Sequence, residues 1–71
     1  MLDRIKASLS SLAPAEQRVG TLVLIDPRAF ANLPVSELAS RASVSKPTVV
    51  RFCRSMGYDG LSDFKLTLAG S

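Results

Sequence analysis

The chain has 71 residues, the length of one small domain near the lower limit at which a hydrophobic core is stable without disulfides or metals. Hydrophobic residues make up 46% of it, which suits a packed core and excludes a disordered tail. One cysteine excludes an internal disulfide framework and fits a reducing, cytoplasmic setting. The chain contains no histidine, the commonest general base and metal ligand, so we expect neither an enzyme nor a metal or cofactor site.

The charges are unevenly distributed along the chain. Nine basic and six acidic residues give a net charge of +3, and all six acids lie outside the stretch from Leu38 to Tyr58. The charges inside that stretch are Arg41, Lys46, Arg51 and Arg54. A surface of one sign favours an anionic partner such as nucleic acid, although a merely solvated basic face is the alternative. No apolar run approaches the roughly 20 residues of a membrane span, so we expect no membrane association.

Two amphipathic helices are predicted first. The apolar residues of the first recur at three- and four-residue steps, at Leu2, Ile5, Leu9 and Leu12. The second begins with Pro14 in its first turn and ends at Asp26, because the residue before Pro27 is pushed out of the α region. Its run of apolar residues at positions 22–25 predicts a central helix or a face shared with another chain.

The segment 27–34 is bounded by prolines and reads as a connection, anchored to the core by Phe30 and Leu33. A short helix follows over about Val35–Ala42. A last helix over about Leu61–Ala69 is expected to pack against the first two helices and close the core. No pair of alternating runs flanks a tight turn, so the sequence predicts an all-α, compact bundle of about five short helices.

A further helix is predicted over about 46–56. Ser45 suits its N-cap, with the hydroxyl accepting from a free N–H of the first turn, and Pro47 is tolerated in that turn. Gly57 ends the helix because glycine enters the left-handed cap freely. The residues expected to face the core follow the i, i+3, i+4, i+7 pattern and are Val49, Phe52, Cys53 and Met56.

The helices 35–42 and 46–56 are separated by the three residues 43–45, with Val44 expected to tuck between them. This spacing predicts a helix-turn-helix over about 35–56, in a homeodomain-like three-helix core with flanking helices. In that geometry the second helix enters the DNA major groove. Ser43 stands where many such turns place a left-handed glycine, so its backbone would carry about 1 kcal/mol of strain.

The residues expected to contact DNA lie at the start of this second helix or on its exposed face: Ser45, Lys46, Pro47, Thr48, Val50, Arg51 and Arg54. Arg51, near the middle of the exposed face, is the candidate for bidentate recognition of guanine. Lys46 and Arg54 are expected at phosphates, and Val50 against a thymine methyl group. Tyr58 and Phe64 fit the core better than a stacking platform for bases.

The stretch from Glu37 to Lys65, ELASRASVSKPTVVRFCRSMGYDGLSDFK, resembles the N-terminal domain of the RpiR family of bacterial transcription regulators. The matching pairs are Leu38-Ala39, Val44-Ser45, Thr48-Val49, Arg51-Phe52 and Gly57-Tyr58, followed by Gly60. The segments LAPAEQRV and LIDPRAF also resemble the family, so the resemblance covers nearly the whole chain.

This resemblance implies one DNA-binding domain over residues 1–71, from a homodimeric, cytoplasmic regulator of sugar or other carbon metabolism. Family members carry a sugar-isomerase-type domain after it that binds a sugar-phosphate effector, and no part of that domain is in this sequence. The alternative function is a basic helical module for protein interaction or dimerisation without DNA binding. Salt dependence of duplex binding would distinguish the two.

Overall fold

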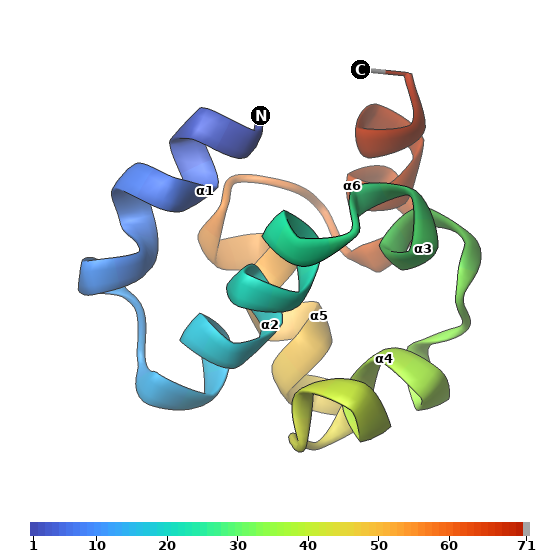
Figure 1. Ribbon diagram of the computed structural model, residues 1–71, viewed down its shortest axis with the longest axis horizontal. Coiled ribbons are helices and arrows are strands. Elements are labelled where there is room, and N and C mark those ends of the chain that lie inside the picture. The colour runs from blue at the N-terminus through green and yellow to red at the C-terminus, as the bar shows by residue number, and fades with distance from the viewer. Residues whose placement is uncertain (71) are drawn as a thin grey trace.

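The structure is a computed structural model that describes residues 1–70, which form six α-helices and one 3₁₀ helix and no strand (Figure 1). The helices are α1 (Leu2–Ser8), the 3₁₀ helix η1 (Leu9–Ser11), α2 (Pro14–Ile25), α3 (Pro27–Asn32), α4 (Val35–Ala42), α5 (Lys46–Ser55) and α6 (Leu61–Ala69). The predicted all-α class is confirmed. Within residues 1–70, no helix is long and apolar enough to cross a membrane.

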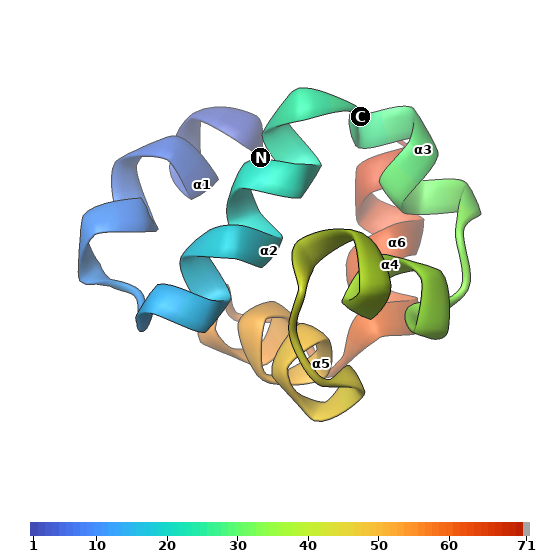
Figure 2. The ribbon, with the colours of Figure 1, turned by 60° about the horizontal axis from the view of Figure 1, so that its bottom comes forward.

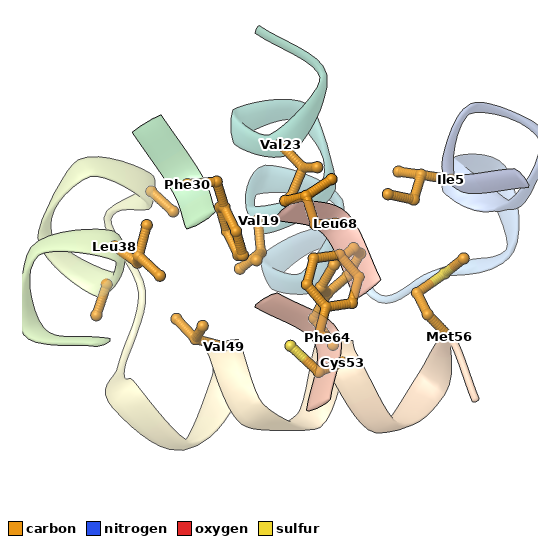
Figure 3. Close-up of a cluster of buried hydrophobic side chains, with 13 residues drawn as sticks. Ile5, Val19, Val23, Phe30, Leu38, Val49, Cys53, Met56, Phe64 and Leu68 are labelled. Atoms are coloured by element: carbon orange, nitrogen blue, oxygen red, sulfur yellow. The ribbon is translucent and has the colours of Figure 1, made fainter. Parts of the chain in front are cut away.

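The core is one cluster to which all six α-helices contribute, centred on aromatic rings (Figure 3). Phe64 of α6 meets Phe30, Phe52 and Tyr58 edge to face, at ring centroid distances of 5.5, 5.6 and 5.1 Å. This geometry is favourable because the positive ring edge meets the negative ring face. Tyr58 and Phe64 therefore belong to the core, as predicted.

Helix α2 is central, as its apolar run predicted, and it contacts α1, α3, α4 and α5. Val19 and Val23 on it are fully buried. Between them Gly20 allows close helix packing, because a Cβ atom there would lie 2.8 Å from Leu9 Cδ2 and 3.2 Å from Phe52 Cε1. The first helix is shorter than the leucine spacing suggested, since α1 ends at Ser8 and the chain tightens into η1.

The segment 27–34 is not a plain connection, and that prediction is wrong: residues Pro27–Asn32 form α3. Pro27 occupies the start of this helix, where a proline costs little, and Asp26 Oδ1 accepts from Ala29 N at 3.1 Å. Phe30 is 1% exposed, so burial of one large side chain stabilises a six-residue helix that would be marginal alone.

The expected packing of α6 against the first two helices is also wrong. The bounds of α6 agree with prediction, but the helix packs chiefly against α3 and α5. Helix α6 lies beside α3 because Phe30 of α3 packs against Phe64 of α6. In addition, the Lys65 ammonium donates to the Leu33 carbonyl just before α4, which fixes the approach to the helix-turn-helix.

Candidate DNA-binding interface

Helices α4 and α5 have the spacing of a helix-turn-helix, and the turn between them is closed by two backbone hydrogen bonds. Val44 N donates to Ala39 O at 2.9 Å and Ser43 N to Ser40 O at 3.2 Å, the two bonds of a Schellman cap. Ser43 adopts φ 58° and ψ 44°, so a serine holds the left-handed position at a cost of about 1–2 kcal/mol. Val44 is half-buried against the core, as predicted.

The far end of α5 closes in the same way. Gly57 has φ 94°, Gly57 N donates to Arg54 O at 2.9 Å, and Tyr58 N donates to Cys53 O at 3.1 Å. The predicted stop at Gly57 is confirmed, with α5 ending at Ser55 and Met56 as its C-cap residue. Hydrogen-bonded turns therefore fix the path of the backbone both before and after α5, and with it the orientation of the helix.

One face of α5 is anchored in the core (Figure 3). The four residues predicted to face inward are buried, with exposures of 0–3%: Val49, Phe52, Cys53 and Met56. Burial raises the pKa of the Cys53 thiol from 9.0 to about 12, which makes it an unreactive core residue at neutral pH. Within residues 1–70, no group of three potential metal ligands occurs.

Two expectations at the start of α5 are wrong. Thr48 was expected on the outward face but is 9% exposed, because it begins the turn that packs against the core. Ser45 is the N-cap residue by position, yet its side chain makes no cap hydrogen bond. Instead the Ser45 and Thr48 hydroxyl oxygens pair at 2.8 Å, and Thr48 N donates to Ser45 O at 3.1 Å.

The outward face of α5 consists of two rows at four-residue spacing. One row is Lys46, Val50 and Arg54, and the other is Pro47, Arg51 and Ser55. Val50 is half-buried and the other five are exposed. Lys46 and Arg51 have no hydrogen bond or ion pair with any residue in the described range 1–70, so both charges are available to a ligand.

The remaining polar groups near this face have partners. Arg54 Nε donates to the Asp59 carbonyl at 3.2 Å, across the turn after α5. Ser55 Oγ donates to Glu16 Oε1 at 2.7 Å, which joins α5 to the first turn of α2. Sequence reasoning missed this second contact because its residues lie 39 positions apart. Arg41 forms an exposed ion pair with Glu37 on α4, at 3.4 Å, of a kind that adds little stability.

The family model described as "Helix-turn-helix domain, rpiR family" matches residues 1–71. The chain belongs to this family. The predicted resemblance is thereby confirmed over the whole length. The family description names a helix-turn-helix, and α4 and α5 are the two helices of this chain that have its spacing.

Curated relatives are much longer than this domain. It is 52% identical over 69 residues to the Bifunctional protein glk of Paraburkholderia xenovorans, covering 97% of the chain and 11% of the relative. It is 42% identical over 71 residues to the HTH-type transcriptional regulator HexR of Escherichia coli, covering 100% of the chain and 25% of that protein.

Solved structures agree with the assignment. The N-terminal domain of the putative transcriptional regulator ybbH from Bacillus subtilis superposes with a TM-score of 0.91 at 30% identity, covering 99% of this chain and 85% of that one. The NanR protein of Vibrio vulnificus, solved in complex with ManNAc-6P, gives a TM-score of 0.92 at 32% identity, covering 97% of this chain and 26% of that one.

Proposed function

We propose that this rpiR-family domain binds double-stranded DNA sequence-specifically, with α5 in the major groove. The observation that carries the proposal is the division of α5 into a fully buried row and an exposed basic face. Lys46 and Arg51 project from a helix whose opposite side is fixed in the core, and no described residue neutralises them. A rigid helix with free cations on one face suits a groove lined by phosphates and base edges.

The residues divide into base-reading and backbone-contacting groups. Arg51 reads guanine O6 and N7 bidentately, and Val50 contacts a thymine methyl group. Lys46 and Arg54 contact phosphates, joined at the start of the helix by Ser45 and Pro47. Thr48 was also expected to contact DNA; because it is buried and its hydroxyl pairs with that of Ser45, we propose that it holds the Ser45 hydroxyl in place.

We further propose that two domains act as a homodimer on inverted half-sites. Half-sites on one DNA face lie about 34–36 Å apart, or about 10 base pairs. The domain measures 26 × 24 × 22 Å, so two copies fit side by side at that spacing. Binding by one isolated domain would be weak, because it covers one half-site.

The regulated genes belong to sugar or related carbon metabolism in this proposal, and the site of action is the bacterial cytoplasm. The names of the relatives support it, since HexR is a transcriptional regulator and NanR was solved with ManNAc-6P. The chain spans about a quarter of either protein. A sugar-phosphate effector would therefore bind a sugar-isomerase-type domain outside this sequence, and none of the residues described here is assigned to it.

A salt titration tests DNA binding. The affinity of the domain for a labelled random duplex is measured by fluorescence anisotropy between about 50 and 200 mM salt. Contact with about three phosphates predicts a slope of log affinity against log salt near −2.7, or roughly a 40-fold loss across that range. Affinity that does not change with salt would overturn the proposal and favour a protein-interaction module.

A further inference from the structure

The exposed face of α5 changes in electrostatic character along its length. Its first half carries Lys46 and Arg51, with no carboxylate hydrogen-bonded to either. At its far end, each of the two exposed rows meets an oxygen from another element. Arg54 donates to the Asp59 carbonyl, and Ser55 donates to the Glu16 carboxylate. The first half of the face therefore carries cations alone, while its far end carries both the Arg54 cation and the Glu16 carboxylate.

The Glu16 carboxylate lies beside the row of α5 that carries Arg51. Ser55 lies one helical turn beyond Arg51 on the same row, and its hydroxyl holds Glu16 Oε1 at 2.7 Å. Glu16 itself is half-buried in the first turn of α2, so its position is restrained. No cation among residues 1–70 lies within ion-pair distance of it, so no side chain of the described residues neutralises this carboxylate by direct contact.

We propose that Glu16 is a specificity-determining residue that repels DNA phosphates from Ser55, at the end of the row that carries Arg51. The inference rests on the proposed DNA-binding function. Non-specific binding depends almost wholly on phosphate contacts, so a fixed carboxylate weakens it in every register that brings a phosphate near Ser55. The specific complex is additionally held by base contacts from Arg51 and keeps Ser55 clear of the backbone, while Arg54 on the neighbouring row contacts a phosphate. Repulsion of the wrong registers raises the ratio of specific to non-specific affinity.

The variant Glu16→Gln isolates the charge, because glutamine retains the oxygen that accepts from Ser55. We expect the affinity for a random duplex at about 50 mM salt to rise roughly two- to fivefold, as for one charge interaction across several ångströms of water. The gain should shrink towards 1 M salt, where screening shortens to about 3 Å. Affinity for a duplex selected from a random pool by the wild-type domain should rise less, so the specificity ratio falls.

Two further variants serve as controls. Asp26→Asn removes an exposed carboxylate at the opposite end of α2 from Glu16, about 15 Å away along a helix that rises about 1.5 Å per residue, and it retains the oxygen that accepts from Ala29 N. Ser55→Ala removes the hydrogen bond but leaves the Glu16 charge in place. We expect neither to raise the affinity for the random duplex as Glu16→Gln does. Thermal melting followed by circular dichroism establishes that all three variants are folded at the assay temperature.

Several results would overturn the inference while leaving DNA binding intact. These are an unchanged affinity in folded Glu16→Gln, an equal gain in Asp26→Asn, or a gain that does not diminish with salt. Absence of salt-dependent binding by the wild-type domain would instead overturn the proposed function itself. A gain confined to Glu16→Gln and to low salt, with a reduced specificity ratio, supports the assignment.

Discussion

The proposed division of roles between Arg51 and Lys46 can be tested directly. Both side chains are exposed, and neither has a partner among residues 1–70. Truncation of either to alanine therefore leaves no buried group unsatisfied, and the free energy of unfolding should change by no more than about 0.5 kcal/mol. Any effect on DNA binding then reports the contact with DNA and not the stability of the domain.

The two truncations should have different magnitudes and different signatures. A bidentate arginine–guanine contact contributes roughly 1–3 kcal/mol of base discrimination, so Arg51→Ala should lose about 5- to 150-fold in preference at one base position. In the proposed complex, Lys46 at the helix entrance neutralises one phosphate. Lys46→Ala should weaken all sequences alike and reduce the salt slope by about 0.9, a factor of about 3.5 between 50 and 200 mM.

The assay is competitive selection from a randomised duplex pool, followed by salt titrations on selected and random duplexes. Arg28→Ala is the matched control, because Arg28 is an exposed arginine on α3, which lies remote from α5 in Figure 2. Removing it lowers the net charge equally but should leave base preference and salt slope nearly unchanged. If Arg51→Ala lowered the affinity for all sequences equally and kept the base preference, Arg51 would be a phosphate contact. The residues that recognise the bases would then be others, such as Lys46 and Val50.

Three predictions concern the scaffold. Ser43→Gly should stabilise the domain by about 0.5–1 kcal/mol in chemical denaturation. Glycine relieves the left-handed strain at this position, and the greater backbone entropy that it loses on folding offsets part of that gain. An unchanged free energy of unfolding would argue against the strain. Gly20→Ala should destabilise it by about 1–3 kcal/mol, since its Cβ would crowd Leu9 and Phe52, and a raised melting temperature would contradict this packing. Cys53 should react with a thiol reagent at pH 8 only as fast as the domain unfolds, and rapid labelling in native buffer would contradict its burial. Because the folded pKa of Cys53 is raised, its contribution to stability is present below pH 9 and is lost progressively as the pH rises towards 12.

Features controlled by neighbouring residues were predictable from the sequence. The bounds of α4 follow from the prolines and apolar spacing around it, and the stop of α5 from Gly57. The inward row of α5 also follows from its spacing alone. These features depend on interactions within one or two helical turns, where proline, glycine and periodicity act directly.

The errors arose where tertiary contacts override local preference. Two prolines made the segment 27–34 read as a connection, whereas burial of Phe30 against Phe64 and the Asp26 cap turn most of it into a helix. Similarly, the pattern at Ser45 predicted a cap, but its hydroxyl bonds to that of Thr48. The wrong prediction for the packing of α6 follows from the wrong prediction for segment 27–34, because the unpredicted helix α3 supplies the surface on which α6 packs.

The composition of α5 reflects a separation between what folds the helix and what contacts the ligand. Its outward residues include a proline, a β-branched valine and a lysine at the positive end of the helix dipole, none of which favours an isolated helix. The buried row compensates, because Val49, Phe52 and Cys53 are each 0% exposed and Phe52 packs against Phe64. Since tertiary packing stabilises the helix, its outward residues are free to serve DNA recognition without unfolding the domain. Substitutions on the outward rows should then change the affinity or the base preference of a folded domain, whereas substitutions on the buried row should remove binding by removing the fold.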